Sequence, residues 1–167
     1  MPSRELEQFI SAWEHEAKST LKLLRALPTD KYDFRPDLEG RSLGECAWHL
    51  SEVDAFITDG VINGKFDFSQ KLPGLERPRT IAELAPGYER VHQGCVARIK
   101  ALKPEDLDKV VPFMGRDMRA GDLLWFVLLH HLVHHRGQLV LLCRLAGGTP
   151  PGMYGPTREE MAAMRQN

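Results

Sequence analysis

The sequence predicts an all-α protein, an antiparallel up-and-down four-helix bundle followed by a short C-terminal helix. Four segments repeat apolar residues at three- and four-residue steps, which is the period of one face of a helix. Proline and glycine gather between these segments, as is typical of connections. The chain has 167 residues, the usual size of one domain, and we expect a single domain over residues 1–167.

The first two helices have signals at their ends. The first is expected after Ser3, because apolar residues recur at helical spacing as far as Leu27 and Pro28 then stops the helix. The second is expected to open at Ser42, with Glu45 three residues further on. This spacing is typical of a capping box, in which two side chains satisfy free backbone amides at the start of a helix.

The third and the last helix carry the same kind of signal. Thr80 and Glu83 have capping-box spacing, and the third helix is expected to run to about Leu102. A short last helix is expected after Thr157. Between them, the stretch Val110–Phe113 has the composition of a strand and could pair briefly, but two short strands add little to a fold.

The fourth helix is expected from about Gly121 to Ala146, where Gly147 ends it. It is apolar nearly all round, and Leu123–Leu129 contains no polar residue. A helix of this kind needs burial on more than one side, which a small bundle does not provide by itself. We therefore expect a homodimer.

Composition argues against several classes of partner. The formal net charge is -1, from 22 basic and 23 acidic residues, so no nucleic-acid surface is expected. Met1–Ile10 lacks the pattern of a signal peptide, and the longest apolar run, Leu123–Leu129, is too short for a bilayer, so no membrane partner is expected. Three cysteines on apolar stripes predict reduced core thiols and a cytoplasmic protein, with a site role for the first as the alternative: Cys46, Cys95 and Cys143.

Histidines form the main candidate site. His130, His131, His134 and His135 fall within six positions of the fourth helix, and residues four apart lie on one helix face, about 5–6 Å from each other. Each such pair could bind one divalent transition metal at about 2.0–2.1 Å, with His49 from the second helix as the third ligand. Spacing does not choose between the two pairs. A surface histidine tract or a hydrogen-bonded core histidine is the alternative interpretation.

Several neighbouring residues have two interpretations each. Gln138 could contact a substrate or the ligands, or it could satisfy backbone groups. Arg136 could bind a carboxylate of a ligand, although a salt bridge is favoured. Gly137 is expected to permit close approach of another helix. His15 and His92 have polar neighbours in the sequence and are expected to be solvated.

Three segments resemble one family. The sequence Ala47–Leu50, preceded by Ser-Leu-Gly-Glu, resembles the second helix of the DinB-like family. The sequence His131–Gln138 resembles the family's His-x-x-x-His-Arg-Gly-Gln motif on its last bundle helix, and Gly147–Gly155 is similar to its tail. The resemblance extends over nearly the whole chain.

This resemblance implies a four-helix bundle that holds a divalent metal, usually zinc or nickel, through three histidines. Carried over by motif position, these are His49, His131 and His135. Some members of the family are thiol-dependent transferases that use bacillithiol or mycothiol, and one branch includes a mycothiol-dependent maleylpyruvate isomerase. The resemblance gives the scaffold and the site, and leaves the substrate open.

Three neutral histidines leave a divalent metal positively charged, with an open position for a small molecule. Such a centre can stabilise a thiolate, so we expect a transferase that activates a low-molecular-weight thiol toward a small electrophile. A metal-dependent hydrolase at the same site is the alternative, as is a non-catalytic stress-response protein that binds a metal or a ligand. The sequence contains no Gly-rich phosphate loop and no Gly-x-Ser-x-Gly motif.

Overall fold

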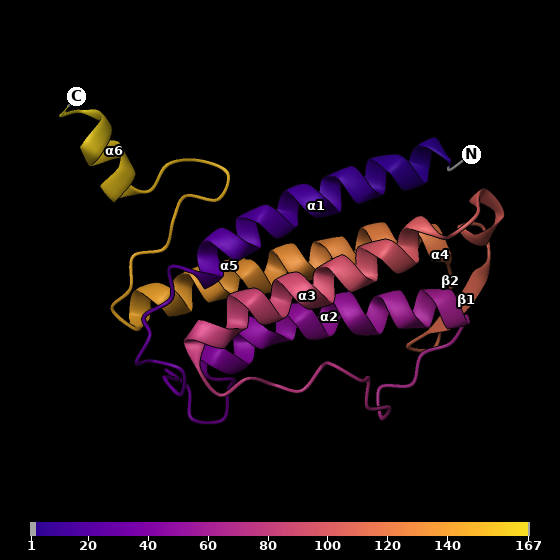
Figure 1. Cartoon of the computed structure of the whole chain (residues 1–167), viewed down its shortest axis with the longest axis horizontal. Helices are drawn as coiled ribbons and strands as arrows, with labels where there is room; N and C mark the ends of the chain where they lie inside the picture. The colour runs from indigo at the N-terminus through magenta and orange to yellow at the C-terminus, as the bar shows by residue number, and fades with distance from the viewer. Residues whose placement is uncertain (1–2, 167) are drawn as a thin grey trace.

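The computed structural model describes residues 3–166, and it is a four-helix bundle, which confirms the predicted all-α class (Figure 1). The fourth helix is built from a π-helical segment, η2, that continues into α5. The long elements of the bundle are α1 (Arg4–Leu24), α2 (Leu43–Asn63), α3 (Ile81–Lys100), η2 (Leu123–Leu129) and α5 (His130–Leu145). A short helix, α6 (Arg158–Met164), follows outside the bundle. Among the described residues, no helix is both long and apolar enough to cross a membrane.

The predicted antiparallel up-and-down order is wrong for one pair of neighbouring helices, α2 and α3, which run in the same direction. Asp54 and Asp59 of α2 contact His92 and Arg98 of α3, both at 2.8 Å, so the two helices run the same way. The connection of residues 64–80 makes this possible, because it returns along the length of the bundle (Figure 1). Fully extended it could reach roughly 50 Å, whereas α3 is only about 30 Å long.

The helix ends follow most of the predicted signals. Ser42 and Thr157 both form complete capping boxes. Thr80 does not, because its hydroxyl donates to the carboxylate of Glu83 at 2.6 Å instead of accepting from the backbone. The first helix ends at Leu24, one turn earlier than the apolar pattern indicated.

The predicted brief strand pairing is present as a hairpin before the fourth helix. Strand β1 (Val110–Phe113) pairs antiparallel with β2 (Arg116–Arg119), and Phe113 faces Arg116 across the turn. Met114 and Gly115 both have positive φ, 48° and 79°, which is the two-residue turn that suits the twist of a hairpin. A short 3-10 turn, η1 (Pro104–Asp106), precedes the hairpin, and α4 (Ala120–Asp122) follows it.

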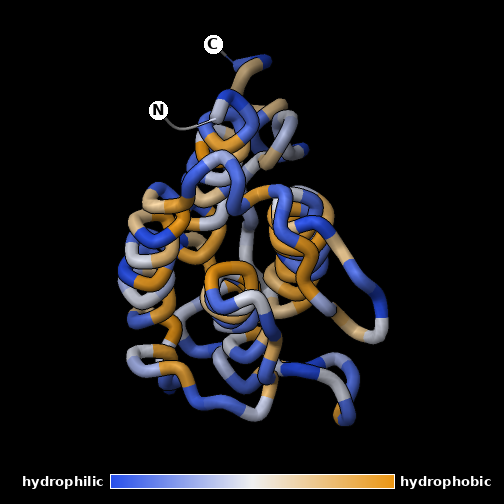
Figure 2. Tube along the Cα trace, turned by 90° about the vertical axis from the view of Figure 1, so that its right-hand side faces the viewer, coloured by the Kyte–Doolittle hydropathy of each residue, from blue (hydrophilic) through white to orange (hydrophobic). Residues whose placement is uncertain are grey.

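The bundle buries its core between the four helices, which Figure 2 shows nearly end-on, with apolar and polar positions on different sides of each coil. Trp13, Trp48 and Tyr88 are fully buried, and α5 contributes Leu132 and Leu139 to the same interior. These side chains join α1, α2, α3 and α5 into one packed body. Trp13 and Tyr88 lie at the helical spacing that predicts a buried stripe, whereas Trp48 lies beside the predicted stripe of its helix.

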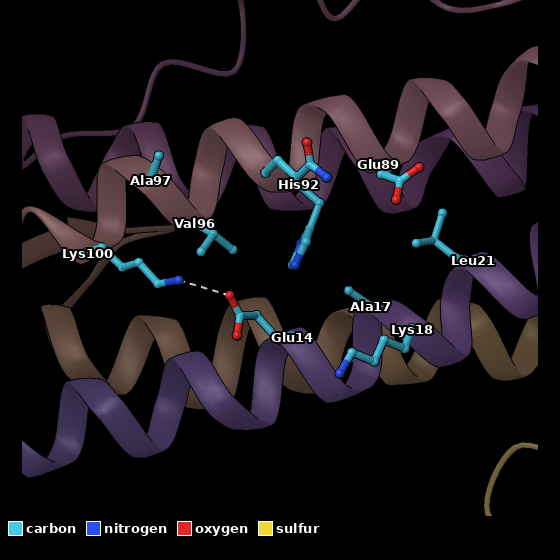
Figure 3. Close-up of a pocket in the computed structure, with 10 residues that line it drawn as sticks. Glu14, Ala17, Lys18, Leu21, Glu89, His92, Val96, Ala97 and Lys100 are labelled. Atoms are coloured by element: carbon cyan, nitrogen blue, oxygen red, sulfur yellow. Dashed lines mark hydrogen bonds and ion pairs between the residues drawn. The ribbon is translucent and has the colours of Figure 1, made fainter.

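A buried polar group lies at the centre of this core. His92 is 7% exposed, so the expectation that it is solvated was wrong, whereas His15 is exposed as expected. The Nδ1 atom of His92 lies 2.8 Å from the carboxylate of Asp54, which also accepts a hydrogen bond from Trp13 Nε1 at 3.1 Å. Figure 3 shows His92 reaching from α3 toward α1. Its polar neighbours in sequence did not reveal that it faces inward on the helix.

Candidate metal centre

The structure brings three of the predicted histidines together on the outside of the bundle. His49 comes from α2, and His131 and His135 come from α5. Each offers one ring nitrogen, and these three nitrogens lie within 4.8 Å of one another. The Nε2 atoms of His49 and His131 are 3.4 Å apart. The set therefore converges on one point between the two helices.

Among the described residues, the other two histidines of the cluster do not belong to this group. His134 bonds to Gln138 through Nε2 at 3.1 Å, and the ring of His130 lies against Phe126. Both are exposed. Of the two pairs with equal spacing, His131 with His135 is the one that faces His49.

The three-histidine group is open to solvent on one side. His131 is exposed, and His49 and His135 are half-buried, so the site is a surface groove. Partial burial lowers the pKa of His131 and lowers that of His135 to about 4. These two imidazoles are therefore neutral at pH 7, which is the form that binds a metal.

A carboxylate that was not predicted from the sequence orients His49. The Glu52 carboxylate lies 3.1 Å from His49 Nδ1, and its other oxygen accepts a hydrogen bond from Arg77 at 2.9 Å. Burial alone would raise the pKa of Glu52, but the hydrogen bonds from His49 and Arg77 outweigh it and lower the pKa. Glu52 is three residues after His49, one helical turn, so the spacing could have identified it. Glu45, one turn before His49, belongs instead to the capping box of α2.

Gln138 holds the third histidine in a similar way. Its side-chain oxygen lies 2.7 Å from Nδ1 of His135. An Nδ1–H bond to this oxygen leaves Nε2 of His135 free to bind a metal. The possibility that Gln138 contacts the ligands is thus the one that the geometry favours.

Other residues of the motif serve the fold. Arg136 is buried and turned away from the histidines, and it pairs with Glu16 of α1, so the salt-bridge interpretation is confirmed. Gly137 is exposed, and no atom of the described part of the chain lies within 4 Å of where its Cβ would be, so the expected close approach of another helix was wrong. Cys46 is buried, and burial raises the pKa of its thiol to about 11, as fits a core residue.

Two cavities flank the three-histidine group. The first, of about 360 Å³, includes His49 and His131 in its wall, and its other lining is mostly apolar. The second, of about 310 Å³, is lined by Gln138 and Cys46 among others. Arg41 contributes to both cavities. The first cavity therefore reaches the histidines directly, whereas the second lies next to the site through Gln138 and Cys46.

A larger hollow lies elsewhere, between α1 and α3 (Figure 3). Its volume is about 500 Å³, and an ion pair between Lys100 and Glu14 spans it at 3.0 Å. It contains His92 but none of the three clustered histidines. We therefore place the candidate site on α2 and α5.

The fold and the histidine group define a class of helical-bundle proteins with an open three-histidine site. A family profile described as the DinB family matches residues 1–167, and the chain belongs to this family. The chain is 36% identical over 161 residues to the uncharacterized protein YrdA of Bacillus subtilis (strain 168), covering 94% of this chain and 92% of YrdA. The predicted family resemblance is thereby confirmed.

Solved structures agree with this placement. A DinB-like protein from Bacillus cereus ATCC 10987 is similar with a TM-score of 0.75 and 31% identity, covering 89% of this chain and 97% of that one. The DinB-like protein YjoA from Bacillus subtilis has a TM-score of 0.72 at 22% identity, with 90% and 99% covered, and supports the fold alone.

Proposed function

We propose that this protein binds a divalent transition metal, zinc or nickel, through His49, His131 and His135. The donor set supports this, because ligands at about 2.0–2.1 Å around a tetrahedral centre lie roughly 3.4 Å apart. His49 and His131 have that separation already, and all three nitrogens lie within 4.8 Å. Small rotations of the side chains would complete the set.

We further propose that the site transfers a low-molecular-weight thiol to a small electrophile. A bound divalent cation supplies a positive charge that lowers the pKa of a thiol at its open position. The observation that carries this proposal is the cavity with His49 and His131 in its wall, together with a second cavity that includes Gln138 and shares Arg41 with the first, so that two substrates have separate places. A hydrolase needs a cavity for one substrate and water.

The chain's own residues would have separate tasks in this reaction. Glu52 and Gln138 fix the ring orientation of His49 and His135 through their Nδ1 atoms. Arg41 borders both cavities and places a positive charge between the two substrates. The apolar wall of the first cavity would exclude water from the electrophile.

Metal content after dialysis, followed by a turnover assay, tests the proposal. The assay combines the metal-loaded protein with a chromogenic aryl halide, in the presence and absence of a thiol. We expect turnover only with the thiol. Thiol-independent hydrolysis of an ester or amide panel would indicate the hydrolase, and full metal content without either activity would indicate a binding protein.

Five variants test the ligand assignment within the same experiment. Three should lose stoichiometric metal: His49→Ala, His131→Ala and His135→Ala. Two neighbours with the same residue type should retain it: His130→Ala and His134→Ala. Loss in His134→Ala with retention in His135→Ala would overturn the assigned pair, and retention in His49→Ala would remove the third ligand.

We also propose that the protein is a cytoplasmic homodimer. Large apolar side chains remain exposed along the fourth helix, namely Phe126, Leu141 and Leu145. The three cysteines are unpaired and buried, as suits a reducing compartment. Sedimentation equilibrium should return twice the chain mass, and a monomer at micromolar concentration would contradict the dimer.

A further inference from the structure

The first cavity beside the histidines has an aromatic wall built from three separate parts of the chain. Phe56 comes from α2, Phe68 from the connection after it, and Phe113 from the hairpin. The rings contact one another: the centroids of Phe56 and Phe68 are 6.3 Å apart, and those of Phe68 and Phe113 are 6.2 Å apart. Met114 and Val127 extend this apolar surface toward His131. The volume of about 360 Å³ fits a small organic molecule.

The charged residues of this cavity differ in what they already bind. Glu52 is occupied, because it contacts both His49 and Arg77. Arg41 is exposed, and within residues 3–166 it forms no hydrogen bond or ion pair. Arg35, on the same connection, is instead paired with Glu45 at 3.2 Å. The cavity therefore presents one uncommitted charge, which is positive.

Arg41 lies close to the histidines as well as to the apolar wall. Burial is the main cause of the lowered pKa of His131, and the positive charge of Arg41 lowers it further. A guanidinium in this position can donate two parallel hydrogen bonds to a carboxylate. The cavity thus combines an apolar body with an anion-binding group at its rim.

We propose that this cavity selects a small organic anion with an aromatic body, seated among Phe56, Phe68 and Phe113, with its carboxylate on Arg41. Binding of this kind needs no metal. The inference rests on the proposed function only for the reaction that follows binding, in which the molecule would be the electrophile facing the histidines. It adds a substrate class to that function.

Calorimetric titration with two probes of the same shape tests the inference. The probes are 3-phenylpropionate and 3-phenylpropanol, each titrated into the metal-free and the zinc-loaded full-length protein. We expect the carboxylate to bind about tenfold more tightly than the alcohol in both forms, because a charge-assisted hydrogen bond is stronger than a neutral one. Equal affinities for the two probes would overturn the inference.

Two variants separate the charge from the apolar wall. Arg41→Gln should bring the two affinities within about twofold of each other. Arg90→Gln should keep the tenfold preference, because Arg90 lines a different cavity and is likewise exposed and unpaired within residues 3–166. Phe68 is 58% exposed, so the Phe68→Ala variant should fold normally. It should bind both probes about fivefold more weakly, because it loses apolar contact area. An unchanged preference in Arg41→Gln, or unchanged affinities in Phe68→Ala, would refute the assigned pocket.

The metal-free arm distinguishes this inference from the proposed function. Selective binding without metal, together with absent thiol transfer, would refute the transferase and leave the pocket intact. A carboxylate preference that appears only with zinc, and survives in Arg41→Gln, would place the anion on the metal and overturn the inference.

Discussion

Replacing Glu52 by glutamine should weaken metal binding without unfolding the protein. The carboxylate lies 3.1 Å from Nδ1 of His49, and its negative charge favours a proton on that nitrogen. Nε2 of His49 then carries the lone pair, and this is the atom that faces His131 at 3.4 Å. A glutamine keeps the shape but can donate to Nδ1, which would move the proton to Nε2 and block the metal.

The expected size of the effect follows from these contacts. Loss of a group that orients a metal-binding histidine costs about 10- to 100-fold in affinity, which is roughly 1.4–2.7 kcal/mol. The variant also loses the ion pair with Arg77, whose side chain is more than a third exposed. A surface pair of this kind contributes about 0.2–1 kcal/mol, so the metal-free protein should remain folded.

The assay is a competition titration of zinc against a fluorescent chelator, with urea unfolding of the metal-free protein in parallel. Asp59→Asn is the matched control, because Asp59 lies on the same helix, pairs with Arg98 at 2.8 Å and is buried to a similar degree. The control should lose similar stability and keep the zinc affinity of the native chain. If both variants lower the affinity for zinc equally, or if Glu52→Gln changes this affinity less than threefold, the orienting role of Glu52 is refuted.

Two further predictions concern stability. Burial lowers the pKa of His135 to about 4, so this histidine binds a proton more readily in the unfolded chain, where its pKa is near the ordinary 6.5. The free energy of unfolding of the metal-free protein should therefore fall by about 1 kcal/mol between pH 7.5 and pH 5, after allowance for partial exposure. Urea unfolding of His135→Gln should show a flatter pH dependence. Glu16→Gln leaves the buried guanidinium of Arg136 without its counter-charge. This should lower the free energy of unfolding by about 3 kcal/mol, which corresponds to a fall in Tm of roughly 6–12 °C. Glu159→Gln removes the solvent-accessible pair between Glu159 and Arg144 and should lower the Tm much less than Glu16→Gln does. A similar Tm for the two glutamate variants in calorimetry would contradict this prediction.

The helices could be predicted from the sequence because each carries its own period and its own end signals. Ser42 with Glu45 is a local pattern, and the capping box that it predicts depends on no other part of the chain. The common direction of α2 and α3, in contrast, does not follow from a local pattern. Hydrophobic period is the same whichever way a helix runs, so only the length of the connection, residues 64–80, carried that information.

Some residues of the site could likewise be predicted from local spacing in the sequence, and others could not. The pairing of His131 with His135 is a property of one helix turn, and Glu52 lies one turn from His49, so both are accessible to spacing arguments. Arg41 has no such relation to the histidines. It reaches the cavity because the chain before α2 is folded against the bundle, through Tyr32, whose backbone oxygen accepts from the amide of Gly44 at 2.9 Å.

The π-helical segment limits what the start of the fourth helix can indicate about the direction in which the histidines point. Counting back seven residues from His131 gives Leu124, but that count assumes an α-helix, and η2 has the wider turn of a π-helix over Leu123–Leu129. The buried position of Leu124 therefore carries no information about the face of His131. The regular α-helix resumes at His130, so the rings of His131 and His135, one α-helical turn apart, lie 4.4 Å from each other. The interruption thus sets the rotation of the histidines relative to the packed start of the helix, and the side chains that meet His49 follow from it.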